Sequence, residues 1–385
     1  MLFNLKIKAS VISKHEKQKL IIGKHLLADW EIFCPIGPSL AFHVGACIGQ
    51  FLYVHGGRID RNSIEASNKL HCLNFDTMIW NEVRVPGSPA LSHHACVTIG
   101  DRYLLLIGGW DGKARTSKVF VFDTLECKWL YPSAEGFPSD AGLSSHTATL
   151  LNNGKVLILG REGPLRMQPD DKIHGNAYML TGSIESGKFA YSEYSRATES
   201  RSGHTTNFIG PRLYVLGGRN DQLLEVHSGY RSGSPDNEKV TESFKKIIKR
   251  LKPMEKMPGG RKHHIALESS GAILIHGGET FDGRSKIGKP VGDMFIMTDK
   301  PSINFYKIGE SKVGRSGHIC CVTKDENILI HGGLGHKIIH AYQLDLPREC
   351  TERKSGLSPL SKALQRRIEC KQVEQLKGQI LSCIM

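Results

Sequence analysis

The sequence predicts an all-β fold in which six similar units close into a propeller. The segment RSGHTTNFIGPRLYVLGG, Arg201 to Gly218, has five relatives elsewhere in the chain. In each copy a histidine precedes a glycine pair by 13 or 14 residues, and successive first glycines are 52, 52, 57, 60 and 55 residues apart. A period of about 50 residues with alternating strand content is typical of propeller units.

The repeat positions form a regular framework along the chain. They are His43, Gly56 and Gly57; His94, Gly108 and Gly109; His146 and Gly160; His204, Gly217 and Gly218; His264, Gly277 and Gly278; and His318, Gly332 and Gly333. Only the third copy departs from the pair, because Arg161 follows Gly160. Paired glycines end a strand where the backbone takes a positive φ or passes close to another segment.

Each unit is expected to hold four strands, because a lone hairpin cannot bury its apolar face. Two units show the second pair of strands plainly: KLHCLNFDTMIWNEV (Lys69 to Val83) and KVFVFDTLECKWLYP (Lys118 to Pro132). Each has an apolar strand, an Asp-Thr turn and a strand with a tryptophan, Trp80 or Trp129. The glycine pairs and these spaced aromatics resemble kelch repeats over roughly residues 29 to 346. The resemblance implies a six-bladed kelch β-propeller.

The last unit stops after AYQLDL, Ala341 to Leu346, and so lacks a fourth strand on its C-terminal side. DWEIF, Asp29 to Phe33, resembles the tryptophan strands but has no unit of its own. We expect this N-terminal strand to close the ring by pairing into the last blade, which removes open sheet edges.

The predicted organisation is an extension over residues 1–28, a propeller over 29–346 with an insert at 219–262, and a tail over 347–385. The formal charges of these three appendages are +5, +5 and +4, so the net +13 of the chain does not belong to the propeller. Basic tails give salt-sensitive binding to acidic partners or nucleic acid. We favour solvated tails and expect no nucleic-acid partner.

Two segments outside the repeats have helical spacing. In the fourth unit Val240, Phe244, Ile247, Ile248 and Leu251 predict a short amphipathic helix that ends before Pro253. It caps the irregular blade or, alternatively, docks a partner. The tail from Pro359 to Leu381 is predicted to be helical or disordered.

Composition narrows the cellular setting. No apolar run approaches the roughly 18 residues of a membrane span, so a membrane protein is not expected. The ten cysteines include no CxxC, which disfavours zinc. Scattered cysteines without an apolar leader indicate reduced thiols in the cytoplasm or nucleus.

Catalytic chemistry has no supporting constellation, so we expect no enzyme, no catalytic residue, no cofactor and no metal. A histidine repeated once per unit is structural by default, although imidazole is a common ligand. The pairs His93 with His94 and His263 with His264 leave a metal or polar ligand open. Some kelch propellers are enzymes, so the alternative is a metal-dependent or sugar-modifying enzyme.

The resemblance also implies where a partner binds. In kelch domains that bind peptides, the residues after the glycine pair and those before the first strand share one face around the channel. Carried over by motif position, this face comprises Arg58, Trp110, Asp111, Arg161, Glu162, Arg201, Arg219, Asn220, Arg261, Glu279 and Arg315. Arginine captures carboxylates or phosphates in bidentate fashion, and Arg and Trp are enriched at hot spots. Alternatively Arg201 and Arg315, both in Arg-Ser-Gly-His, serve the repeat itself.

Several motifs resemble a narrower group of stand-alone kelch propellers. They are GGWDG (Gly108 to Gly112), GLSSHT (Gly142 to Thr147), GREG (Gly160 to Gly163), SRSGH (Ser200 to His204), RKHH (Arg261 to His264) and HGGET (His276 to Thr280). This resemblance implies a monomeric, non-enzymatic scaffold that binds a partner protein, with a cyclin or another cell-cycle protein in view. A substrate receptor of a ubiquitin ligase is the alternative role.

Overall fold

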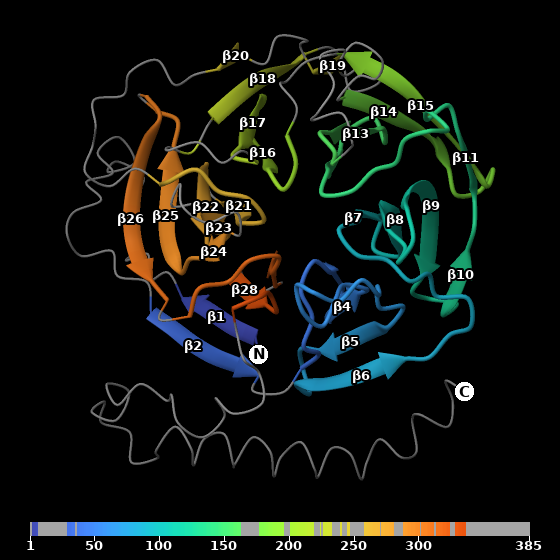
Figure 1. Cartoon of the computed structure of the whole chain (residues 1–385), viewed down its shortest axis with the longest axis horizontal. Coiled ribbons are helices and arrows are strands. Elements are labelled where there is room, and N and C mark those ends of the chain that lie inside the picture. Colours follow the sequence, from blue (N-terminus) through green and yellow to red (C-terminus); the bar gives the residue numbers. More distant parts are fainter. Residues whose placement is uncertain are drawn as a thin grey trace.

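The computed structural model is an all-β molecule whose sheets are arranged radially about a central axis (Figure 1). It describes residues 2–6, 29–34, 37–162, 177–195, 201–218, 224, 226–232, 239–240, 245–246, 258–269, 271–280, 288–300, 302–311, 313–323 and 328–335. No helix occurs in these ranges, and hence none that is long and apolar enough to cross a membrane.

Three sheets come from the first half of the chain. The first consists of β3 (Val44–Ile48), β4 (Phe51–His55), β5 (Leu70–Asn74) and β6 (Ile79–Val83). The second consists of β7 (Ala95–Ile99), β8 (Tyr103–Trp110), β9 (Arg115–Asp123) and β10 (Lys128–Leu130). The third consists of β12 (Thr147–Leu150), β13 (Val156–Leu159), β14 (Ala177–Ser183) and β15 (Lys188–Ser195), with β11 (Ser133–Glu135) parallel to β15.

Three further sheets follow. The fourth consists of β16 (Thr205–Ile209), β17 (Arg212–Leu216) and β18 (Val226–Ser232), with β19 (Lys239–Val240) and β20 (Lys245–Lys246) both paired to β18. The fifth consists of β21 (Ile265–Ser269), β22 (Ala272–His276), β25 (Asp293–Thr298) and β26 (Asn304–Glu310). The sixth consists of β27 (Ile319–Val322), β28 (Ile328–His331), β1 (Leu2–Lys6) and β2 (Asp29–Cys34). A small ribbon joins β23 (Glu279–Thr280) to β24 (Lys289–Pro290).

The predicted closure by an N-terminal strand is confirmed, because β2 contains DWEIF and forms the outer strand of the sixth sheet. The strand next to it differs from our expectation. β1 comes from residues assigned to the basic extension, and it pairs with β28 on one side and β2 on the other. Ala341 to Leu346 lies outside the described residues.

The helix expected over Val240 to Leu251 is not found in the described part of this segment. Lys239–Val240 and Lys245–Lys246 are instead short strands antiparallel to β18. The outer edge of β18 would otherwise present unpaired N–H and C=O groups, and pairing them outweighs a helical pattern that is only a weak preference. The tail over 347–385 also lies outside the described residues.

Apolar side chains fill the seams between neighbouring sheets. In the described ranges one cluster joins sheets 1 and 6 through Leu52 and Leu329, and another joins sheets 2 and 3 through Leu105 and Ile158. Equivalent clusters fill the other four seams. The second strands of the third and sixth sheets, β13 with VLIL and β28 with ILIH, are buried along their whole length because these sheets pack on both faces.

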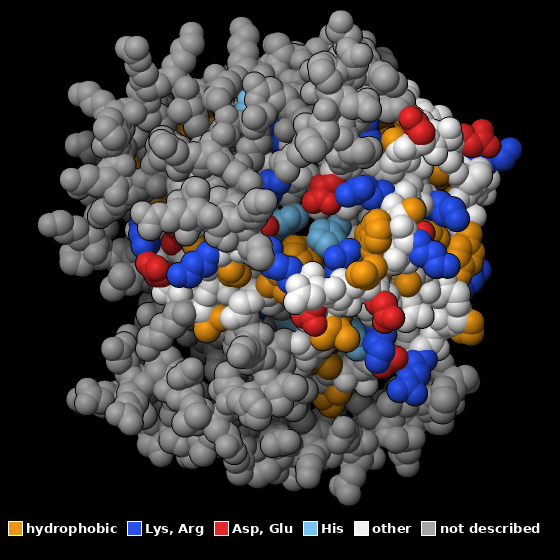
Figure 2. Space-filling view, in the orientation of Figure 1, with side chains coloured by type: hydrophobic (Ala, Val, Ile, Leu, Met, Phe, Trp, Pro, Cys, Tyr) orange, Lys and Arg blue, Asp and Glu red, His pale blue; other side chains and the backbone are white. Residues whose placement is uncertain are grey.

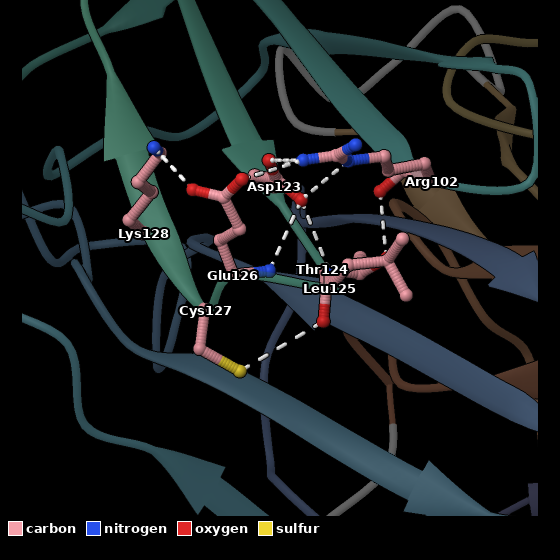
Figure 3. A network of polar contacts seen from close by, with 7 residues as sticks. All are labelled: Arg102, Asp123, Thr124, Leu125, Glu126, Cys127 and Lys128. Carbon is pink, nitrogen blue, oxygen red and sulfur yellow. Dashed lines mark hydrogen bonds and ion pairs between the residues drawn. The ribbon is translucent and has the colours of Figure 1, made fainter.

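The Asp-Thr turn predicted between the outer strands is well defined in the second sheet (Figure 3). The carboxylate of Asp123, which is buried, accepts two bonds from Arg102, of 2.9 and 2.6 Å, and one from the Leu125 amide at 3.0 Å. The Arg102 guanidinium holds the pKa of Asp123 below its usual range. Thr124 donates its hydroxyl to the Arg102 carbonyl at 2.7 Å, so the turn is tied to the strand next to it.

Candidate functional site

The residue before each repeat histidine forms a closed ring around the channel. These six residues are Phe42, His93, Ser145, Gly203, His263 and Gly317. The amide of each donates to the carbonyl of the preceding member, and the amide of Phe42 closes the cycle on Gly317, with all six distances between 2.7 and 2.9 Å. The ring therefore links every repeat unit to both of its neighbours.

Every member of this ring has a positive φ. The angles are 67° at both glycines but 53–57° at Phe42, His93, Ser145 and His263. A side chain in this left-handed region costs about 1–2 kcal/mol. Four side chains are thus held at the channel at positions where glycine is the unstrained residue.

Three aromatic rings from this cycle meet over the channel. Phe42 stacks on His93 with ring centroids 4.1 Å apart, and both rings lie near His263, at 5.1 and 5.8 Å. We call Phe42, His93 and His263 the mouth cluster. It packs over the two ring glycines: a Cβ on Gly203 would lie 2.9 Å from His263, and one on Gly317 would lie 2.6 Å from Phe42.

A cavity of about 220 Å³ lies along the channel. It is lined by the six ring residues and by the six repeat histidines, His43, His94, His146, His204, His264 and His318. The space-filling view shows the hollow at the centre of the molecule, with histidine side chains inside it and charged side chains around it (Figure 2). His93 is adjacent to His94 in the sequence and His263 to His264, and in the structure all four line this cavity.

The repeat histidines are buried and neutral. Burial lowers the pKa of His43, His146 and His264 to about 3, and that of His94, His204 and His318 well below 6.5. In four of them a ring nitrogen bonds a side chain of the preceding unit, for example His204 Nε2 to Thr147 Oγ1 at 3.0 Å and His318 Nε2 to His276 Nδ1 at 2.9 Å. Four of the six thus make side-chain bonds that join one sheet to the next.

Histidine pairing at the channel also raised the question of a metal. In the described ranges, no three His, Cys, Asp or Glu side chains lie so that they could hold a metal ion. His93 Nδ1 lies 3.2 Å from Ser92 Oγ, and His263 Nε2 lies 4.0 Å from Glu279 Oε1. These imidazoles therefore have polar neighbours within the protein.

Three arginines assigned to the partner face are instead part of the core. Arg201, Arg261 and Arg315 are 1–2% exposed. Each donates to the carbonyl of the first glycine of its own unit: Gly217 at 2.7 Å, Gly277 at 2.9 Å and Gly332 at 2.6 Å. Our assignment of these side chains to an open face was wrong, and the alternative that they serve the repeat is confirmed for Arg201 and Arg315.

Arg161 is also buried, at 5% exposure. Its amide donates to the Arg201 carbonyl at 3.0 Å, the same bond that Gly57 makes to Leu91 at 2.8 Å. Arg161 therefore occupies the position of the second glycine of its unit, and its side chain does not lie on the face that we predicted.

Four of the remaining predicted residues, Arg58, Trp110, Glu162 and Glu279, lie beside residues that flank the ring. Backbone bridges pair Arg58 with Ala41, Trp110 with Ser92 and Glu279 with Lys262, and the Glu162 amide donates to the Ser144 carbonyl. The residues after the glycine pairs therefore lie beside the residues before the first strands, as the motif positions predicted. Asp111 follows Trp110 and is exposed, whereas Arg219 and Asn220 lie outside the described residues.

Three residues at the mouth were missed. Arg61, from the loop after β4, donates to Glu279 Oε2 at 2.5 Å across 218 residues of sequence. Arg115 lies 3.8 Å from Glu162. Phe42 had a signal in the sequence, because it directly precedes a repeat histidine, but no periodicity identifies the partners of Arg61 and Arg115.

The comparisons with known proteins agree with this architecture. A family model described as the KLHDC2/KLHL20/DRC7 kelch-repeats domain matches residues 30–218. Kelch domain-containing protein 9 of Mus musculus is 29% identical over 314 residues, which covers 77% of this chain and 87% of that protein. The Homo sapiens protein of the same name is 28% identical over 316 residues, with the same coverage.

Kelch domain-containing protein 3 of Homo sapiens is more distant, at 23% identity over 324 residues, 79% of this chain and 80% of that protein. Among solved structures, that of YjhT has the same fold, with a TM-score of 0.55 and 16% identity over 78% of this chain and 96% of that one. The motifs GGWDG to HGGET had indicated similarity to kelch domain-containing protein 9, and the comparisons confirm it. The chain is thus similar to kelch-repeat β-propellers over most of its length.

Proposed function

We propose that this protein is a non-enzymatic interaction module that binds a partner protein through the face at the channel mouth. In this proposal each four- or five-stranded sheet is one of six blades, and the propeller works as a monomer in the cytoplasm or nucleus. The observation that supports it best is that Arg58, Trp110, Glu162 and Glu279, from four different repeat units, each bond a residue that directly precedes a member of the ring lining the cavity. Loops that a rigid scaffold holds together are the usual place for recognition.

The chemistry of this face supports protein recognition. Trp110 is half-buried, its indole N–H donates to the Ile64 carbonyl at 3.0 Å, and the Arg58 guanidinium lies 5.9 Å from its ring centroid. Two isoleucines of the adjacent loop, Ile59 and Ile64, are 75% and 67% exposed. Arginine, tryptophan and exposed aliphatic side chains around a hollow form the kind of surface from which interface hot spots are built.

The partner belongs to the same proposal. The similarity to kelch domain-containing protein 9 leads us to put a cyclin or another cell-cycle protein first among the partners to test. The alternative role is that of a ubiquitin-ligase substrate receptor, in which the module also carries a ligase subunit.

Affinity capture from cells tests the proposed function. The full-length chain is compared with a mouth variant, Arg58→Ala with Trp110→Ala, and with Leu125→Ser, a control at a 72% exposed position in the Asp-Thr turn of sheet 2. We expect one specific partner to bind the parent and the control but not the mouth variant. That partner is then checked by direct binding with purified proteins, using a purified cyclin as the first case.

Two outcomes would contradict the proposal. Equal capture of the same partners by all three chains places recognition away from the mouth. Turnover of a small molecule by the purified chain, abolished by mouth variants, favours the enzyme alternative. Co-purification of a ligase subunit through another surface assigns the receptor role.

A further inference from the structure

Among the described residues, three partly exposed arginines lie near the channel mouth, and two of them are matched by a carboxylate. Arg61 is held by Glu279 at 2.5 Å, and Arg115 lies 3.8 Å from Glu162. Arg58 has no carboxylate of the described residues within ion-pair distance; its Nε donates to the Ser92 hydroxyl at 3.1 Å. Within the described part of the chain, the charge of Arg58 is therefore not balanced by a direct ion pair.

The surroundings of Arg58 make this charge costly to leave unpaired. The side chain is half-buried, and burial lowers its pKa, against a weaker opposite effect of Glu162. One face of the guanidinium lies toward the Trp110 ring. A cation that has lost part of its hydration gains more from an incoming anion than one in open water.

Polar groups that orient Arg58 lie next to it. Ser92 Oγ contacts both Arg58 Nε, at 3.1 Å, and His93 Nδ1, at 3.2 Å, so these three groups form a continuous polar chain that ends at the cavity. Ser92 is fully buried, so its hydroxyl positions Arg58 and His93 and does not itself face a ligand. His93 lines the cavity, where its imidazole can donate a hydrogen bond without adding charge.

Two ring residues with a positive φ, Phe42 and His93, lie next to the Arg58 site. Phe42, whose neighbour Ala41 exchanges both backbone bonds with Arg58 at 2.8 and 2.9 Å, brings its ring under the mouth together with His93. Since glycine would remove the strain at both positions, the side chains are retained at an energetic cost. Such outliers are typical of functional sites.

The rim limits how much negative charge the mouth accepts. Glu162 and Glu279 flank the channel, and each is partly neutralised by its own arginine. A cluster of acids would meet repulsion from both carboxylates, whereas one acid at Arg58 lies within the field of Glu162 alone. The exposed Ile59 and Ile64 next to this place suit an apolar neighbour in the bound segment.

We propose that the mouth recognises one oxyanion-bearing side chain of the partner, which binds the Arg58 guanidinium that Ser92 orients, beside the cavity-lining Phe42 and His93, next to an apolar residue that packs on Ile59 and Ile64. The inference rests on the proposed function and adds the chemical group of the partner that the mouth binds. The oxyanion has two sources in proteins, the carboxylate of Asp or Glu and the phosphate of a phosphorylated serine or threonine.

Selection of displayed random peptides against the full-length chain tests this inference. We expect the enriched peptides to share one acidic residue beside an apolar one. Four synthetic versions of the best peptide then carry Glu, Gln, phosphoserine or Ser at the acidic position. We expect Glu→Gln to weaken binding at least tenfold, and the stronger of the Glu and phosphoserine peptides identifies the source of the oxyanion.

Protein variants complete the cycle. With Arg58→Ala or Arg58→Gln the difference between the Glu and Gln peptides is expected to fall below twofold, whereas with Leu125→Ser it stays tenfold. Thermal unfolding of each variant verifies that it is folded. Substitution at Arg58 is well suited to this use, because the side chain is half-buried at the rim, where it contacts Ser92 and Trp110.

The outcomes separate this inference from the proposed function. Peptides that depend on Trp110 but not on their acid or on Arg58 overturn the oxyanion anchor and leave the mouth as the binding face. Peptides indifferent to every mouth variant overturn both. Enrichment of acid-free sequences, or no enrichment over a selection without the chain, also counts against the anchor.

Discussion

The first three repeat units and the last three place residues of opposite character at the same buried position. The position three residues before the repeat histidine is buried in all six units, but it is leucine at 40, 91 and 143 and arginine at 201, 261 and 315. In every unit its carbonyl accepts the amide that follows the first glycine of the preceding unit. The backbone role is thus constant, whereas the side chain is free to be apolar or charged.

Units 4 to 6, which we call the arginine half, show how a buried guanidinium is stabilised. Leu91 and Leu143 belong to apolar clusters, whereas Arg261 donates to the Gly277 carbonyl and to both oxygens of Asp293, at 2.6 and 3.0 Å. Arg315 donates to Gly332, and burial lowers its pKa to about 10. A guanidinium replaces a leucine here because carbonyl groups of the glycine pairs lie within its reach.

Acid should produce the largest effect, because it acts on both halves at once. Burial lowers the pKa of His43, His55, His146, His264 and His276 to about 3, whereas the unfolded chain protonates them near 6.5. Their contribution to stability is therefore complete well above pH 6.5 and falls as the pH decreases toward 3, by about 1.4 kcal/mol per histidine at pH 5.5. We expect the Tm, followed by circular dichroism at constant ionic strength, to drop steeply between pH 7 and 5. An unchanged Tm over this range would show that these imidazoles are not held neutral.

Leucine substitutions at Arg261 and Arg315 should lower the free energy of unfolding by different amounts. Arg261→Leu leaves the Asp293 carboxylate without its partner and is expected to cost about 3 kcal/mol or more. Arg315→Leu reproduces the residue of units 1–3 and is expected to cost about 1–2 kcal/mol, the value of a lost bond to the Gly332 carbonyl. Denaturant unfolding measures both, with Leu143→Ala, at about 2–5 kcal/mol, as the matched loss in the leucine half. Equal costs for the two arginines would mean that Asp293 contributes nothing.

The smallest effect is expected at the ring. Ser145 has a φ of 53°, and its hydroxyl lies 3.2 Å from Glu162. Ser145→Gly removes about 1–2 kcal/mol of backbone strain and loses one partly exposed hydrogen bond, so we expect a slight gain in stability of about 0.5 kcal/mol. Gly203→Ala is the opposite control, because its Cβ would lie 2.9 Å from His263. A clear loss of stability in Ser145→Gly would show that the ring side chains support the fold rather than the site.

Much of the fold was predictable from sequence because repeats encode it locally. The glycine pairs, the repeat histidines and the Asp-Thr turns each depend on a few neighbouring residues, and together they predicted an all-β propeller closed by an N-terminal strand. The helical periodicity of Val240 to Leu251 gave a wrong prediction for the described part of this segment. The short strands found there pair with the edge of β18, which depends on residues remote from that segment.

The candidate site was only half predictable for the same reason. Motif position placed Arg58, Trp110 and Glu162 at the mouth, because one local rule repeats in each unit. It placed Arg201, Arg261 and Arg315 there too, since arginine in a sequence gives no indication of burial. Only the folded units show that these three guanidinium groups are buried and that each bonds the first glycine carbonyl of its own unit.

The sequence by itself determined the repeat, its spacing and the residues that form the turns and strands of each unit. The tertiary structure alone decided that β1 lies between β28 and β2, that Phe42, His93 and His263 meet over one channel, and that Arg61 reaches Glu279 across 218 residues. The physical reason is that turn and strand preferences act over a few residues, whereas burial and charge pairing depend on which segments the closed ring brings together.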